Sequence, residues 1–197
     1  MPAPFVGHDG TVAHLTTDEL SASLDEVRGS PVGRGVVDLI VRRPAVGARE
    51  LIDEATLTAA HGIEGDSWQQ RGSRHTADGS AEFDRQITIM NSRAIALLAG
   101  SHDRGRWAEA GDQLYVDISL RDRDLPVGTR LQLGTAVIEI SAKPHTGCAK
   151  FAERFGIEAA RFVNSPDGAE LHLRGINAFV VTDGVVRTGD IAEITTV

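Results

Sequence analysis

The 197 residues suffice for one domain with a sizeable core, and 41% hydrophobic and 24% charged residues exclude a disordered chain or a coiled coil. The formal net charge of −8 argues against a nucleic-acid partner bound mainly through its phosphates, and no apolar run is long enough to span a membrane. A single cysteine, 21 glycines and the lack of a basic amino-terminal signal segment predict a turn-rich cytoplasmic protein.

Residues 1–31 are predicted to form an amino-terminal appendage with one short helix. The helical pattern begins at Thr16 and carries Leu20, Leu24 and Val27 on a narrow apolar stripe. We expect this stripe to pack on the surface of the main domain, residues 32–197.

The next segments have mainly the patterns of strands. Residues 36–41 form a run typical of a strand buried on both faces, residues 86–90 and 114–120 alternate, and residues 51–60 fit a strand or a helix. Between them, Asn91 or Ser92 can cap a helix that runs through Leu98 and ends at Gly100.

The carboxyl-terminal third predicts two hairpins and two helices. Residues 131–140 turn at Gly134-Thr135, and residues 176–187 turn at Asp183-Gly184. Helices are expected over 148–155 and 157–163, and a further strand over 190–194. Seven or eight strands against three or four short helices predict a mainly β protein, a closed or nearly closed β-barrel with a few peripheral helices.

The segment 141–150 holds the cysteine, Cys148, and the only two lysines, Lys143 and Lys150. Thr146 can cap the following helix and so place Cys148 in its first turn, where free N–H groups favour an anion. Together with His145, the lysines favour the thiolate, which is the nucleophilic and metal-binding form of cysteine.

A purely structural role for this cysteine is equally consistent with the sequence. Cys148 and Phe151, Ala152 and Phe155 have the spacing of one helix face, so that the sulfur could lie in the core. The turn at residues 62–66 is similarly interpreted as a tight turn in which Asp66 caps its own backbone.

Six segments occur in an order and spacing that resembles the MOSC domain, the module at the carboxyl terminus of molybdenum cofactor sulfurases. They are GIEGD (62–66), RQITIMN (85–91), GDQL (111–114), LPVGTRLQLG (125–134), PHTGCAK (144–150) and LRGINA (173–178). The resemblance covers roughly residues 32–195. The chain departs from it in the polar loop 71–84, which contains His75 where many members have His-Gly-Gly.

The resemblance implies a barrel-like fold and a functional Cys148. In the leading interpretation, Cys148 ligates the metal of a molybdenum-pterin cofactor that reduces N-hydroxylated substrates, with electrons from an external donor. Arginine and lysine suit the pterin phosphate, so the candidate cofactor-binding residues are Lys143, His145, Thr146, Arg85 and Arg174.

Two alternatives stay open. In the first, Cys148 carries a persulfide received from a separate pyridoxal-phosphate-dependent desulfurase, and no pyridoxal phosphate is expected in this chain itself. In the second, the domain is non-catalytic, binds a small ligand on its surface and keeps Cys148 as a core thiol.

Overall fold

A computed structural model describes residues 14–73 and 76–195 of the chain. Within these residues it contains eleven strands, eight short α-helices and one 3₁₀ helix. His75 and the first 13 residues of the predicted appendage lie outside the described residues.

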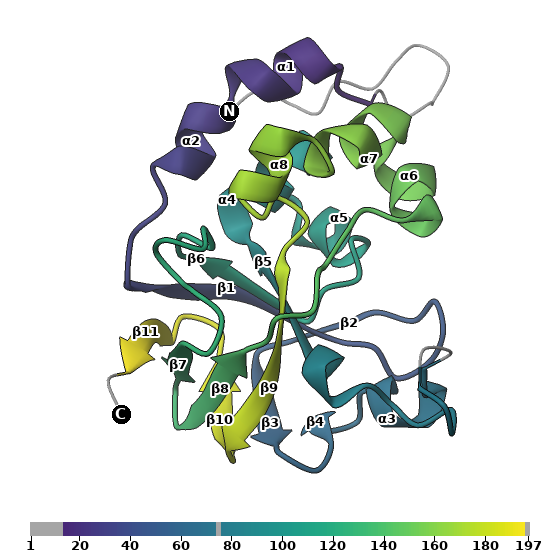
Figure 1. The fold of residues 1–197 in the computed structure, drawn as a ribbon, viewed down its shortest axis with the longest axis vertical. Helices are drawn as coiled ribbons and strands as arrows, with labels where there is room; N and C mark the ends of the chain where they lie inside the picture. Colours follow the sequence, from purple (N-terminus) through teal and green to yellow (C-terminus); the bar gives the residue numbers. More distant parts are fainter. Residues whose placement is uncertain (1–13, 74–75, 196–197) are drawn as a thin grey trace.

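Seven strands form a closed barrel, seen in the lower half of Figure 1. They are β1 (Arg34–Arg42), β5 (Ile87–Asn91), β6 (Leu114–Asp117), β7 (Arg130–Leu133), β8 (Ala136–Ile140), β9 (Ile176–Thr182) and β11 (Ile191–Thr195). Their order is β11-β7-β8-β9-β5-β6-β1, and the antiparallel pair β1–β11 closes the ring. Only β5 and β6 pair in parallel among these strands. The predicted fold class, a β-barrel with short helices, is confirmed.

Aliphatic side chains fill the barrel, and a second apolar layer lies outside part of its wall. Ile87 and Ile89 belong to the interior cluster, whereas Met90 on the same strand packs in the outer one, as does Tyr115 of β6. Strand β5 is therefore buried along its whole length, because helices cover its outer face.

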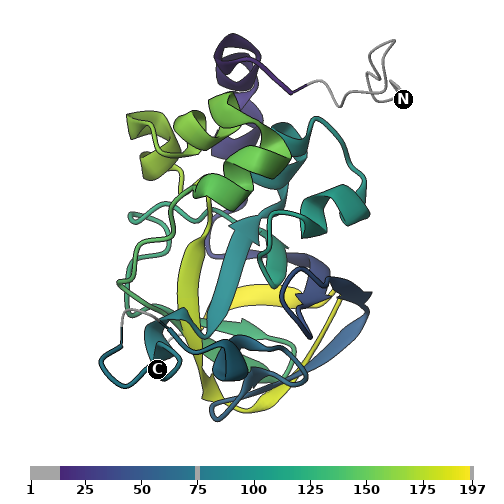
Figure 2. The ribbon, with the colours of Figure 1, turned by 90° about the vertical axis from the view of Figure 1, so that its right-hand side faces the viewer.

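All the α-helices except α3 (Trp68–Arg71) gather over one end of the barrel, as both views show (Figures 1 and 2). They are α1 (Thr17–Ala22), α2 (Leu24–Arg28), α4 (Ser92–Ala99), α5 (Arg104–Ala108), α6 (Ala149–Phe155), α7 (Ile157–Val163) and α8 (Pro166–Glu170). The predicted stripe Leu20, Leu24 and Val27 is buried in the outer layer. None of the described helices has the length and apolar character that crossing a bilayer would require.

The predicted hairpin over residues 176–187 is wrong. Strand β9 pairs with β5 and β8 in the barrel, whereas β10 (Gly184–Arg187) leaves it and pairs with β3 (Glu54–Thr58) in a three-stranded sheet completed by β4 (Gly62–Ile63). Asp183, the residue between β9 and β10, accepts a hydrogen bond from the backbone N–H of Ala59 at 2.8 Å, which ties this connection to the small sheet.

One further expectation, the burial of residues 36–41 on both faces, needed correction, and one open alternative is decided. The first half of β1 alternates between exposed and buried residues, and only its later residues are buried on both faces. The segment 51–60, whose pattern fits a strand or a helix, holds the end of β2 (Glu50–Ile52), which pairs with β1, and the whole of β3, followed by a turn. The helix α8 was not predicted, although Ser165 caps it and Pro166 occupies its first turn.

Local sequence signals place α4 as predicted. The side chain of Asn91 accepts a hydrogen bond from the backbone N–H of Ala94 at 2.9 Å, and Gly100 ends the helix with a left-handed backbone. Gly156 likewise separates α6 from α7 with a φ of 91°.

Candidate functional site

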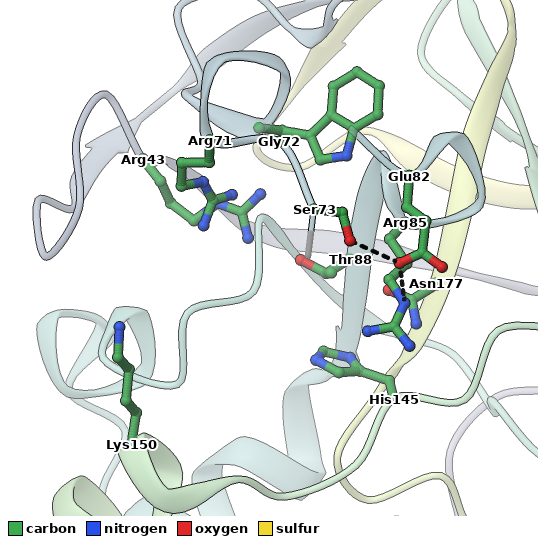
Figure 3. A pocket seen from close by; sticks show the side chains of 11 residues that line it. Arg43, Arg71, Gly72, Ser73, Glu82, Arg85, Thr88, His145, Lys150 and Asn177 are labelled. Atoms are coloured by element: carbon green, nitrogen blue, oxygen red, sulfur yellow. Dashed lines mark hydrogen bonds and ion pairs between the residues drawn. The ribbon is translucent and has the colours of Figure 1, made fainter. Parts of the chain in front are cut away.

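A basic pocket of about 540 Å³ opens beside the carboxyl end of β1 and the start of β5. It is lined by Arg43, Trp68, Arg71, Gly72, Ser73, Glu82, Arg85, Thr88, His145, Lys150 and Asn177. Figure 3 shows Arg43 and Arg71 side by side, Lys150 rising from α6, and Arg85 and His145 across the pocket. Three arginines and a lysine thus meet one carboxylate in a chain whose net charge is −8.

Arg43 follows the last residue of β1 and is fixed by a buried ion pair. Its Nε and Nη2 lie 2.9 and 3.2 Å from the two carboxylate oxygens of Asp66, and its Nη1 donates to the carbonyl of Gly111 at 2.9 Å. Asp66 also accepts from the backbone N–H of Trp68 at 2.9 Å, so the predicted backbone cap is confirmed. The turn 62–66 therefore orients a pocket residue as well as capping itself.

Arg71 lies at the end of α3 (Trp68–Arg71), 3.8 Å from the same carboxylate. Its side chain is 40% exposed. Partial burial and, to a smaller extent, the charge of Arg43 lower the pKa of Arg71. The two guanidinium groups are therefore held close together against their mutual repulsion, an arrangement that an anion would stabilise.

Glu82 is the carboxylate of the pocket and neutralises part of its charge. It lies 3.2 Å from Nε of Arg85, which belongs to the 3₁₀ helix η1 (Phe83–Arg85), and 3.0 Å from Nζ of Lys143. Lys143 contacts the pocket through this carboxylate and does not itself line it.

His145 lies in the connection from β8 to α6 and stands over a buried charge pair. Its Nδ1 is 3.4 Å from Oδ1 of Asp112, and Arg174 approaches the other oxygen of Asp112 at 2.6 Å. Burial, followed by the charges of Arg174, Arg43 and Arg85, lowers the pKa of His145 well below its ordinary value. Burial likewise raises the pKa of Asp112, against the opposing effect of Arg174.

The loop that carries His145 is anchored from the barrel. The side-chain amide of Asn177, on β9, donates to the carbonyls of Lys143 and Pro144 at 3.1 and 3.4 Å. The guanidinium of Arg174 also lies 5.0 Å from the ring centroid of Phe151 on α6. Contacts of this kind hold the loop and the start of α6 against the pocket.

Cys148 is exposed, so the interpretation of its sulfur as a core thiol is wrong. Phe151 and Phe155 do enter the core, but Cys148 precedes the helix as its N-cap residue and does not share their face. Its side chain borders a second hollow of about 420 Å³ between α6 and α7, lined mainly by small and apolar residues.

The expected cap by Thr146 is also wrong, because α6 begins two residues later than that cap requires and carries no side-chain cap. Thr146 is exposed and lines neither hollow.

The structure brings together two of the predicted cofactor-binding residues, Arg85 and His145, at the pocket wall. Lys143 and Arg174 do not line the pocket. Lys143 forms an ion pair with Glu82, and Arg174 forms one with Asp112. Sequence reasoning missed Arg43, whose only local signal is its place at the end of a buried strand. It missed Thr88 and Asn177 as well, since both occupy ordinary strand positions.

Comparisons with known proteins agree with this architecture. The MOSC domain family model matches residues 54–193. The crystal structure of the YuaD protein from Bacillus subtilis is 20% identical and covers 82% of this chain and 95% of its own, with a TM-score of 0.58. That of YiiM from Escherichia coli is also 20% identical and covers 83% and 70%, with a TM-score of 0.53. No curated protein matches the sequence at a significant level.

Proposed function

The chain belongs to the MOSC domain family, and from this premise we propose that its basic pocket binds the anionic part of a molybdenum-pterin cofactor, with the thiolate of Cys148 as a ligand of the metal. The observation that supports the proposal is the gathering of Arg43, Arg71, Arg85 and Lys150 in one hollow of an acidic chain. Such focusing draws anions to one place on a surface that otherwise repels them.

The pocket residues suit a phosphate-bearing heterocycle. Guanidinium groups bind phosphate oxygens through paired N–H donors, and Arg43 is already oriented by Asp66 before any ligand arrives. Thr88 adds a hydroxyl and Asn177 an amide oxygen at the pocket wall, and these can pair with the polar edge of a pterin ring.

In the sequence Cys148 lies three residues after His145 and two before Lys150, which both line the basic pocket; Cys148 itself is exposed and borders the hollow between α6 and α7. A soft thiolate is a suitable ligand for molybdenum. When bound, the cofactor would supply the two-electron reduction of an N-hydroxylated substrate, with electrons from an external donor. The residues of this chain would bind and orient it: the arginines and Lys150 through its anionic part, and Cys148 at the metal.

A second candidate function, sulfur transfer, is favoured by the exposure of Cys148 on the side of the α6–α7 hollow. There the Cys148 thiolate would attack the outer sulfur of a donor persulfide, and the donor thiolate would leave. The donor would be a separate pyridoxal-phosphate-dependent desulfurase. The persulfide formed on Cys148 would then deliver sulfur to a metal or cofactor.

Purification from a host that makes molybdenum cofactor tests the first candidate. We expect stoichiometric molybdenum by elemental analysis and pterin fluorescence after denaturation, both reduced several-fold in Arg85→Gln and in Cys148→Ser. Arg34→Gln is the matched control, because Arg34 is 63% exposed on β1 and pairs with Glu193 away from the pocket.

Wild-type protein without molybdenum or pterin would contradict the first candidate. Persulfide labelling after incubation with a desulfurase and cysteine then tests the second. Labelling that requires Cys148 supports sulfur transfer, whereas no labelling of wild-type protein rejects it.

A further inference from the structure

Asp112 and His145 meet beneath the basic pocket through two polar atoms that lack a hydrogen bond among the described residues. These atoms are Oδ1 of Asp112 and Nδ1 of His145, 3.4 Å apart and both buried. The Asp112 side chain has no exposed surface, and that of His145 is 17% exposed toward the pocket that it lines. Buried polar atoms without a hydrogen bond are uncommon in native proteins, so this pair calls for an explanation.

The two protonation states of the imidazole ring offer an explanation for this pair of atoms. A neutral ring that turns its Nδ1–H toward Asp112 has only a lone pair at Nε2, which would repel an anion in the pocket. A protonated ring donates from both nitrogens. It can then satisfy Asp112 on one side and an anion on the other.

We propose that His145 takes up a proton when a divalent oxyanion enters the basic pocket, and then donates to the anion through Nε2 and to Asp112 through Nδ1. This inference rests on the proposed function for the location of the site. It requires no molybdenum, however, and no participation of Cys148.

The charged groups that face His145 support the uptake, rather than the release, of a proton when the anion binds. Arg43 after β1, Arg85 on η1 and Arg174 before β9 disfavour the imidazolium, and Asp112 before β6 is the acidic group beside it. Because burial and these arginines lower the pKa of His145 well below its ordinary value, its ring is neutral at neutral pH without a bound anion. Two negative charges delivered among the same arginines offset their repulsion and raise that pKa.

Glu82 is the competing proton acceptor, because an incoming anion would repel its carboxylate. Its ion pairs with Arg85 and Lys143 oppose protonation, at 3.2 and 3.0 Å. A test must therefore separate proton uptake at His145 from uptake at Glu82.

Sulfate is a suitable probe, since it carries two negative charges throughout the usable pH range and does not itself accept the proton. Calorimetric titration with sulfate near neutral pH, in Pipes and in Tris, reports proton uptake through the different ionisation enthalpies of the buffers. We expect wild type to take up a fraction of a proton, up to about one per sulfate, and affinity to rise as pH falls, by at most about tenfold per pH unit.

The variants assign the proton. His145→Gln should bind sulfate more weakly and without proton uptake, whereas Glu82→Gln and Cys148→Ser should keep the uptake. His61→Gln is the matched control, because His61 is exposed, bonds Gln69 at 2.8 Å and lies outside this pocket. Should His145→Gln fail to fold, the ¹⁵N shifts of His145 in wild-type protein must move toward imidazolium on sulfate addition.

Three results would overturn the inference: no sulfate binding, binding without proton uptake, or uptake that survives His145→Gln and disappears in Glu82→Gln. None of them depends on molybdenum. Absence of metal from purified protein would reject the proposed cofactor and leave the sulfate result standing.

Discussion

The carboxylate of Asp66, which has no exposed surface, binds the guanidinium of Arg43 across 23 residues of sequence. Removing the charge of Asp66 would leave a cation that is only 8% exposed without its counter-charge. Asp66→Asn should therefore destabilise the fold by about 3–5 kcal/mol, measured by urea unfolding.

The control for this variant is Glu193→Gln, which removes the acid of an exposed pair with Arg34 at 3.2 Å. We expect its cost to stay below about 1 kcal/mol. Equal stabilities of the two variants would show that the buried pair does not stabilise the pocket.

Gly175 and Gly189 provide a matched pair for the packing between β5 and β9. Both have a φ of 93°, but a Cβ on Gly189 would meet no atom within 4 Å, whereas one on Gly175 would lie 2.3 Å from the carbonyl oxygen of Ile89. Gly189→Ala should cost about 1–2 kcal/mol for its backbone alone. Gly175→Ala should cost at least about 1–3 kcal/mol more, because strand β5 must move. Thermal unfolding of the two variants side by side would reveal the difference, and equal costs would contradict it.

Cys148 should be replaceable without loss of stability. Because its side chain is exposed, Cys148→Ser should change the free energy of unfolding by less than about 0.5 kcal/mol. Iodoacetamide should alkylate the native protein at one site, since the chain has one cysteine. Protection of the thiol until the protein unfolds would contradict the exposed position.

His145 should make stability depend on pH on the acidic side of neutrality. Its folded-state pKa is well below that of an unfolded histidine, about 6.5. Above that value both states are neutral at this residue. Below it the unfolded chain binds the proton before the folded protein does. The free energy of unfolding therefore decreases as the pH is lowered, by up to about 1.4 kcal/mol per pH unit, until the folded-state pKa is reached.

Unfolding of wild type and His145→Gln across this pH range checks the sign. The variant should lose less stability than wild type as the pH falls, while His61→Gln should follow wild type. A variant curve parallel to that of wild type would exclude His145 as the source of the slope.

The elements that could be predicted from the sequence are those whose beginning, end or turn is determined by residues within or next to the element. Asn91, which caps α4, and Gly100, which ends it, lie within ten residues of each other, and their effect is exerted on the helix between them. The hairpin of β7 and β8 likewise depends on Gly134, whose φ of 58° suits a tight turn.

Pairings that depend on distant residues could not be predicted. Asp183-Gly184 has the composition of a hairpin turn, yet β10 joins β3, more than a hundred residues earlier in the chain, because the barrel already occupies both edges of β9. Arg43 is oriented by Asp66 and by the carbonyl of Gly111, 23 and 68 residues further along the chain, and nothing near Arg43 in the sequence indicates these partners. Lys150 and Cys148 are two residues apart, but Lys150, in the first turn of α6, lines the basic pocket, whereas Cys148, the N-cap residue of α6, lines the hollow between α6 and α7.

The pairing of β1 with β11, in which Arg34 lies opposite Glu193, closes the barrel between residues 159 apart in the sequence. A ribosome releases β1 early, but this strand finds its last neighbour only when residues 191–195 have emerged. Until then the open edges of β1 and β7 are available to other chains. Ring closure over such a long loop is slow in general, so nascent protein should need either dilution or a chaperone during that interval.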